Sequence, residues 1–423
     1  MRQRIEAQPR RITSGAQPAA RPMRISVLFW PMLVAFAMMV WGVVLRAPTA
    51  AYAGPPDQRS FNNYIFGYLG AYSDITSLYF RDQLWRHPIP YIDYYVEYPV
   101  GMGWLIWLIG FVNSGVMPYL LATAVVMLLS GCIVLWLGSY IEGANLWLLA
   151  LSPTLPLYVV LNWDMFSVML TVAALVLFQR NRDGWGTLLL TAAVWTKFFP
   201  IVLVPLVVFD RVLKRRWRDA CLIGGIFGLG SALINGPVAI VNTPAGWQIR
   251  DTWLHFFRFN QERGSEVNFW TFFAGWQLTL QQINTWSALL LVAGLGILII
   301  LMAYNRRING QNRDVLLPVS LAAIAWFFFI NKVYSPQYSL WLAVLLAFLA
   351  APPTLAVIFA AVDLAYFAGS FIVLYLADTQ NVASAWFFNQ ALLPVTVMRE
   401  AVIFGIVLYA CWRIISRPAA LPT

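Results

Sequence analysis

The chain of 423 residues is 60% hydrophobic and only 11% charged. Because soluble globular proteins carry about 25% charged residues and roughly 45–50% apolar ones, this composition excludes a soluble protein and indicates a polytopic membrane protein. The formal net charge of +10 does not indicate nucleic-acid binding, since the basic residues fall between apolar segments.

Apolar segments of such a chain are expected to be helices, because backbone groups in lipid must satisfy their own hydrogen bonds. We predict an all-α bundle of about 12 transmembrane helices. A further apolar run, 99–112, would reach only about 21 Å against a hydrocarbon core of ~30 Å, so we expect it to lie in the interface. The predicted spans are 25–46, 117–139, 144–161, 165–180, 186–197, 200–212, 219–241, 286–303, 315–330, 338–351, 354–376 and 393–414.

The distribution of basic residues predicts the orientation of the bundle. With the N-terminus inside, most of the 28 Lys and Arg lie in inner segments, as the positive-inside rule requires. Counting 99–112 as a crossing would place Arg180 and Arg182 outside, which favours the interfacial placement of that run. The chain lacks an Asn-X-Ser/Thr sequon. We therefore expect a bacterial plasma-membrane protein with both termini cytoplasmic.

The N-terminal segment admits two interpretations. Arg-rich residues, an apolar run and the Ala-Tyr-Ala at 51–53 resemble a signal peptide with its cleavage site. The run of ~20 apolar residues exceeds the ~7–15 of a usual signal core, so we expect an uncleaved first helix. We assign 1–24 to a disordered cytoplasmic tail, 25–415 to the membrane domain and 416–423 to a second cytoplasmic tail.

The first predicted outer loop, 47–116, contains a candidate catalytic acid. If 74–86 is helical, Asp74 lies at its start, and a carboxylate held there on a membrane surface can act as a general base. The alternative is structural, with Ser73 as the N-cap and Asp74 as the first-turn acid that favours the helix dipole.

The second predicted outer loop, 242–285, contains three arginines, although outer loops normally avoid basic residues. Beside several aromatic residues, these arginines indicate an anionic ligand at the interface. The alternative is that they pair with acidic residues of the same loop. The residues concerned are Arg250, Arg258 and Arg263, with Asp251, Glu262 and Glu266.

Two ionisable residues lie within predicted spans. Lys197 lies where two short apolar runs, 186–197 and 200–212, meet. An ammonium at membrane depth costs ~2.5–3.5 kcal/mol, so it needs an anionic partner, from the protein or from a lipid phosphate, unless it snorkels to the interface. Because the charge is costly without a partner, we expect a Lys197→Met variant to fold as well as the wild type or to gain stability. Asp363 can line a water-filled cavity or accept hydrogen bonds from a neighbouring helix, and we favour the second interpretation.

Two short outer turns carry further polar groups. In the turn 331–338, Pro336 accounts for the reversal of the chain, and a lysine, a glutamine and two tyrosines offer donors to an outer ligand. The turn 162–164 has the sequence Asn-Trp-Asp. Either turn can also be explained by helix capping alone.

Six motifs, in this order along the chain, resemble glycosyltransferase family 87. Its members are GT-C-type membrane enzymes that use polyprenyl-phosphate-mannose, and the similarity covers roughly 25–415. The motifs are Tyr72-Ser73-Asp74, Pro90-Tyr91 through Glu97-Tyr98-Pro99, Asn162-Trp163-Asp164, Lys197-Phe198-Phe199-Pro200, Arg263-Gly264-Ser265-Glu266 and Lys332-Val333-Tyr334-Ser335-Pro336-Gln337-Tyr338.

The resemblance implies a GT-C-type bundle whose first outer loop carries two interfacial helices, 74–86 and 99–112, with Asp74 as the catalytic base. Some relatives carry a His pair at 337–338, where this chain has Gln-Tyr, so no histidine role carries over, and the role of Asp82 stays open. Implied donor-phosphate residues are Lys197, Arg263, Lys332, Gln337 and Tyr338, and possible acceptor or pocket residues are Tyr91, Glu97, Asp164, His255 and Glu266.

The chemistry expected from this resemblance is inverting transfer of mannose from polyprenyl-phosphate-mannose to a lipid-linked or cell-envelope glycan on the outer face. The donor's phosphate is a good leaving group that a positive pocket can stabilise without a metal, and the acceptor hydroxyl needs one base. Hydrolysis, in contrast, uses two opposed carboxylates. We expect no metal and no cofactor, since only two histidines and no paired-cysteine motif are present.

Two alternatives stay open at this point. The same fold can act on another polyprenyl-phosphate sugar, such as arabinofuranose. A non-enzymatic transporter of lipids or solutes would instead use Lys197 and Asp363 as gating charges inside the membrane, and its outer loops would be structural.

Overall fold

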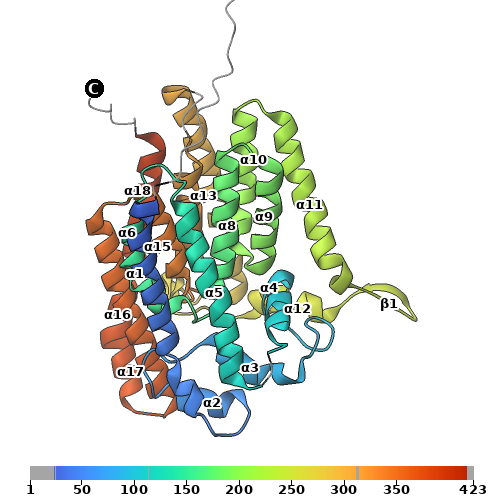
Figure 1. Cartoon of the computed structure of the whole chain (residues 1–423), viewed down its shortest axis with the longest axis vertical. Helices are drawn as coiled ribbons and strands as arrows, with labels where there is room; N and C mark the ends of the chain where they lie inside the picture. The colour runs from blue at the N-terminus through green and yellow to red at the C-terminus, as the bar shows by residue number, and fades with distance from the viewer. Residues whose placement is uncertain (1–22, 24, 113, 311–313, 417–423) are drawn as a thin grey trace, which may run out of the picture.

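The computed structural model describes residues 23, 25–112, 114–310 and 314–416 and is almost entirely helical (Figure 1). The long helices run along the longest axis of the molecule, while short helices and a hairpin gather at the lower end of the view. The predicted tails, 1–24 and 416–423, lie almost wholly outside the described residues.

Six helices in the described part of the chain are long and apolar enough to cross a membrane. Many of their apolar side chains are exposed, as lipid-facing helices require. The six are α1 (Ile25–Val44) with the 3-10 turn η1 (Ala47–Ala51), α5 (Val116–Gly138), α11 (Trp217–Ala239), α13 (Leu280–Asn309), α16 (Pro353–Asp378), and α17 (Ala383–Phe387) continued through η5 (Phe388–Leu392) into α18 (Leu393–Ile415).

The other predicted spans are shorter helices, several of them in the centre of the bundle. Nearly every side chain of α15 and most of those of α14 are buried, so these two helices form the core rather than a lipid-facing surface. The shorter helices are α8 (Asp164–Gln179), α9 (Asp183–Thr196), η3 (Phe199–Val202), α10 (Leu203–Leu213), α14 (Leu316–Ile330) and α15 (Tyr338–Phe348).

The predicted helix 144–161 is broken, which corrects the sequence analysis. It consists of α6 (Leu146–Ala150) and α7 (Thr154–Tyr158), because the proline at 153 lacks the N–H that a continuous helix needs. Arg46 satisfies two carbonyl groups near the end of α7. It is fully buried and donates hydrogen bonds to the carbonyl oxygens of Pro156 (2.9 Å) and Leu157 (2.6 Å).

The first outer loop contains α2 (Gln58–Ile65), α3 (Asp74–Arg81), η2 (Leu84–Arg86) and α4 (Val100–Ile109). The predicted helix 74–86 is therefore interrupted, because Gln83 has a positive φ of 50°, outside the helical region. A helix occurs within 99–112 as predicted, whereas its placement in a membrane interface stays a prediction.

The second outer loop corrects the all-α prediction. Strands β1 (Ile240–Thr243) and β2 (Gly246–Ile249) form an antiparallel hairpin that pairs Ile240 with Ile249 and projects from the lower end of α11 (Figure 1). Gly246 has a φ of 101°, which glycine adopts without strain and which permits the tight turn. The loop continues into α12 (Asp251–Glu262) and η4 (Phe269–Trp276).

A group of paired charges lies at the upper end of the bundle, at the turn from α8 to α9 and the end of α10. The Nη2 of Arg211 is 2.7 Å from Asp183 Oδ1, and Arg211 also pairs with Asp210. Arg216 contacts Asp183 at 2.7 Å, and Lys214 contacts Asp210 at 2.8 Å. We call these five residues the upper charge cluster, which joins the two helix ends.

Candidate active site

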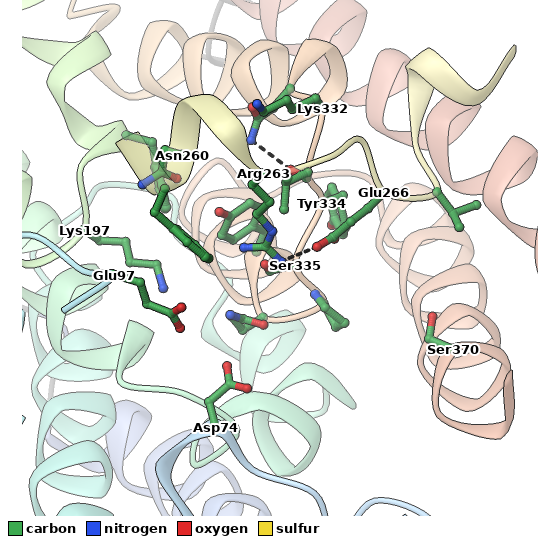
Figure 2. Close-up of a pocket in the computed structure, with 18 of the residues that line it drawn as sticks. Asp74, Glu97, Lys197, Asn260, Arg263, Glu266, Lys332, Tyr334, Ser335 and Ser370 are labelled. Carbon is green, nitrogen blue, oxygen red and sulfur yellow. Dashed lines mark hydrogen bonds and ion pairs between the residues drawn. The ribbon is translucent and has the colours of Figure 1, made fainter. Parts of the chain in front are cut away.

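A cavity of about 1030 Å³ opens at the lower end of the bundle. Its polar wall comes from the first outer loop, the junction after α9, the segment after α12 and the turn before α15 (Figure 2). Eight of the residues proposed from the sequence line it, namely Asp74, Glu97, Lys197, Arg263, Glu266, Lys332, Gln337 and Tyr338.

Three of the proposed pocket residues do not line the cavity. Tyr91 is fully buried, and its hydroxyl donates to two carbonyl oxygens of its own loop at 3.0 and 2.8 Å. His255 packs against the ring of Tyr95, with centroids 4.8 Å apart. Asp164 is buried behind the cavity wall. Tyr91 and His255 therefore stabilise the loops, whereas Asp164 contributes to the cavity through its ion pair with Lys197.

Asp74 occupies the first position of α3, and Ser73 is the N-cap whose hydroxyl oxygen accepts from the N–H of Ile75. The Ser73 hydroxyl also donates to the carbonyl oxygen of Val160 at 2.6 Å, and the Asp74 N–H donates to that of Leu161 at 2.8 Å. The irregular segment after α7 therefore holds the start of α3 in place, with the partly exposed Asp74 at the cavity wall.

The Asp74 carboxylate is held by neutral hydrogen-bond donors. Tyr72 donates its hydroxyl to Oδ1 at 2.9 Å, and Asn162 donates its amide to Oδ2 at 2.7 Å and to the hydroxyl oxygen of Tyr98 at 2.9 Å. Burial raises the pKa of Asp74 above its ordinary value and the negative charge of Glu97 raises it further, while the two hydrogen bonds oppose this rise. A carboxylate with this raised pKa, facing a cavity, is suited to accept a proton.

Lys197 receives its anionic partner from the protein. Its Nζ lies 2.7 Å from Oδ2 of Asp164, whose Oδ1 accepts from Nε1 of Trp341 at 3.0 Å. The ammonium also lies 5.0 Å from the centroid of the Tyr98 ring. The buried pair thus places a cation at the cavity wall beside the residues that surround Asp74.

The opposite wall of the cavity carries two more cations (Figure 2). Arg263 pairs with Glu266, whereas the Nζ of Lys332 donates to the carbonyl oxygen of Gln261 at 2.9 Å and forms no ion pair with any described residue. Burial and the charge of Arg263 lower the pKa of Lys332. With two cations against one carboxylate, this wall has a net positive charge that suits an anionic ligand.

Glu97 and Asp82 share one arginine. Arg81 Nη1 lies 3.0 Å from Glu97, and its Nε lies 2.7 Å from Asp82. Asp82 does not line the cavity, so a role as a second acid facing the substrate finds no geometric support. Glu97 does line it, and its charge acts on Asp74.

Two groups of residues escaped the sequence analysis. Asn260 lines the cavity four residues after Phe256, a spacing that places both on one face of α12. Arg263 follows directly after the end of this helix. That periodicity was a usable signal. Arg399 and Glu400 form a buried ion pair within α18, and ionisable residues inside an apolar span were the signal there.

Within the described residues, no group of three or more His, Cys, Asp or Glu side chains could hold a metal ion. The cavity sets Asp74, with its neutral hydrogen-bond donors, across from the cations of Arg263 and Lys332.

Comparison with known proteins adds one finding. The family model described as Glycosyltransferase family 87 matches residues 95–330, more than half of the chain. The match includes Glu97, Lys197 and Arg263, while Asp74 and Lys332 lie outside it. No curated protein matches the chain. The roles of the residues outside the matched segment therefore depend on the geometry described above.

Proposed function

The chain belongs to glycosyltransferase family 87, and we propose that it transfers mannose from polyprenyl-phosphate-mannose to a lipid-linked or cell-envelope glycan. Membership of the family implies glycosyltransferase activity. The observation that supports the finer proposal is the cavity itself, in which Asp74 lies across from the net positive wall of Arg263 and Lys332 (Figure 2).

The proposed reaction is a single displacement. An acceptor hydroxyl oxygen attacks C1 of the sugar and gives its proton to the Asp74 carboxylate, while the bond between C1 and the phosphate oxygen breaks. The polyprenyl phosphate leaves with the bonding electrons, and Arg263 and Lys332 stabilise its added negative charge. Because attack comes from the side opposite the phosphate, a beta-linked donor yields an alpha-mannoside.

The position of Lys197 suggests a second electrostatic contribution. The Lys197–Asp164 pair is neutral as a whole, but the ammonium faces the cavity and favours the ionised form of Asp74. It also offers N–H donors to a sugar hydroxyl or to a phosphate oxygen. In this proposal the base is Asp74, the leaving-group site is the wall of Arg263 and Lys332, and Lys197 adds a cation near Asp74.

Much of the remaining cavity wall is apolar, which suits a lipid-linked donor. Phenylalanines and leucines of α12, α13, α14 and α16 continue from the polar centre toward the lipid-facing helices, which provides contact area for a prenyl chain. These apolar residues include Phe256, Phe257, Leu291, Phe327, Phe371 and Leu374.

The transporter alternative has less support than the enzyme. Lys197 is paired with Asp164, and Asp363 accepts hydrogen bonds from the hydroxyl groups of Tyr158 (3.0 Å) and Ser339. Both residues proposed as gating charges are thus bound to neighbouring helices, which is the interpretation preferred for Asp363 from the sequence. Donor identity, mannose or arabinofuranose, is tested separately by competition.

The deciding experiment is a transfer assay with purified protein in lipid nanodiscs. Radiolabelled polyprenyl-phosphate-mannose is incubated with acceptor lipids extracted from bacterial membranes, and labelled product is expected only with active protein. Unlabelled polyprenyl-phosphate-arabinofuranose should compete weakly if mannose is the natural sugar. Solute movement into vesicles with no sugar transfer would overturn the enzyme proposal.

The proposed site faces the outside of the cell, with both termini in the cytoplasm. A reporter fused after residue 216 should therefore read cytoplasmic and one inserted at residue 90 should read external, as the distribution of basic residues predicts. A cytoplasmic reading at residue 90 would move the cavity to the inner face and would contradict an outer-leaflet donor.

A further inference from the structure

Arg399 and Glu400 form an ion pair deep inside the bundle. Their side chains are only 2% and 3% exposed, and Nη2 of the arginine lies 2.6 Å from Oε1 of the glutamate. Burying such a pair is often no more favourable than an apolar core of the same shape. Its presence in the apolar helix α18 therefore calls for an explanation beyond stability.

The guanidinium of Arg399 touches three separate elements. Its carbon lies 4.1 Å from the ring centroid of Tyr334 and 3.9 Å from that of Tyr366, and its Nη2 donates to the carbonyl oxygen of Val267 at 2.9 Å. Nε and Nη1 of Arg399 make no hydrogen bond among the described residues. The cation–π contacts with the two tyrosine rings stabilise the guanidinium instead. These three partners line the cavity, whereas Arg399 does not.

Two of these partners belong to the segments that carry the proposed phosphate-binding cations. Val267 directly follows Glu266, the partner of Arg263, and Tyr334 lies two residues after Lys332. The segments also contact each other, since the N–H of Glu266 donates to the carbonyl oxygen of Lys332 at 2.9 Å. Arg399 therefore contacts both segments from the side that faces away from the cavity.

Tyr334 is held on its far side as well. Its hydroxyl is 2.8 Å from that of Ser339, and the Ser339 hydroxyl donates to Asp363. The ring thus has one position, fixed by Arg399 at its face and by α15 and α16 at its hydroxyl. A displacement of Arg399 would reach the backbone of the turn that bears Lys332.

We propose that Arg399 is a positioning residue that sets the separation of Arg263 and Lys332, and thereby the fit of the cavity to the donor phosphate. This inference depends on the proposed function of the two cations. It needs the planar guanidinium, because a lysine ammonium cannot contact two rings and a carbonyl oxygen in the same way.

The test compares Arg399→Lys with Arg211→Lys, which alters a buried arginine of the upper charge cluster far from the cavity. For Arg399→Lys we expect the donor KM to rise about 10- to 100-fold, because a small misplacement of binding groups can have an effect of this size. The acceptor KM should change little. The Arg211→Lys protein should melt at a lower temperature and keep the donor KM of the wild type.

Binding of polyprenyl phosphate without sugar, measured by equilibrium titration, supplies a readout that needs no turnover. Arg399→Lys should bind it more weakly than the wild type, in proportion to the rise in KM. Glu400→Gln, which keeps the shape of the pair, should weaken binding less and provides a second measurement if Arg399→Lys does not fold.

Each outcome decides the inference. Wild-type affinity in both Arg399→Lys and Glu400→Gln, or an equal loss in Arg211→Lys, would show that Arg399 acts only on overall stability. If the wild type neither binds polyprenyl phosphate nor transfers sugar, the proposed function fails and the inference fails with it. If the wild type binds and transfers but the Arg399 and Glu400 variants match it, the inference alone fails.

Discussion

The upper charge cluster and the cavity contain the same kinds of charged residue in two different arrangements. In the cluster, the side chains of Arg211 and Asp183 are 1% and 3% exposed and pair with each other. In the cavity, Arg263 and Glu266 are 37% and 36% exposed, and the carboxylate of Asp74 accepts from neutral donors.

This difference distinguishes a structural cluster of charges from a candidate reactive site. Every charge of the upper charge cluster has its partner in the protein, so the cluster fixes the helix ends and offers nothing to a ligand. The cavity exposes a carboxylate of raised pKa and cations in excess, the combination that functional sites tend to show. Charge alone does not mark the site, whereas incomplete pairing beside open volume does.

The largest difference in transfer rate is expected between Asp74→Asn, in the cavity, and Asp183→Asn, in the upper charge cluster. Loss of a general base lowers the transfer rate about 10²- to 10⁴-fold, while the lost charge at the start of α3 costs only about 0.3–1 kcal/mol of stability. Asp183→Asn should show the reverse, with lower thermal stability and a normal rate per folded molecule. The measurement is the transfer rate of each variant at saturating donor, made on monodisperse protein. Transfer by Asp74→Asn within about threefold of the wild type would contradict the assignment of the base.

The buried pair of Lys197 and Asp164 makes a second contrast possible. Removing one partner of a buried pair costs about 3–5 kcal/mol, so Lys197→Met should lower the melting temperature markedly, contrary to the expectation from the sequence. The double variant with Asp164→Asn should regain most of that stability and still transfer sugar slowly. A double variant with wild-type activity would show that Lys197 serves only the fold.

A third comparison is between Lys332, which lines the cavity with no carboxylate partner in the described part of the chain, and Lys214, which is paired in the upper charge cluster. Lys332→Met removes a cation that has no carboxylate partner among the described residues, so a charge-assisted bond of about 1.5–3 kcal/mol to phosphate is lost. The donor KM should rise about 10- to 100-fold. Lys214→Met, in the upper charge cluster, should leave that KM unchanged. An equal KM in both variants would remove Lys332 from the donor site.

The smallest effects are shifts in the pH profile of kcat/KM. Asp74 must be ionised to act as a base, so activity falls as the pH drops through its raised pKa. Asn162→Ala removes a hydrogen bond that lowers this pKa, so the acidic limb should move to higher pH. Glu97→Gln removes a negative charge that raises it, so the limb should move to lower pH. Shifts of the same sign would contradict the role of Asp74.

The sequence by itself determined the class of the protein and indicated many residues of its candidate site. The positions of the long helices follow from local composition, since each apolar segment must become a helix in lipid wherever it lies. The cap at Ser73 and the acid at Asp74 are likewise local features, and residues such as Lys332 were found because polar groups in short outer turns are conspicuous.

Only the tertiary structure decided which charges are paired and which face the cavity. Lys197 and Asp164 lie 33 residues apart, and nothing local predicts that one neutralises the other. The buried position of Arg46 against the end of α7 depends equally on distant packing. The function inferred for Arg399 depends on two rings and a carbonyl group from three elements. Such partnerships arise because long-range packing brings distant side chains within a few ångströms, and the energy of a buried charge depends on that distance.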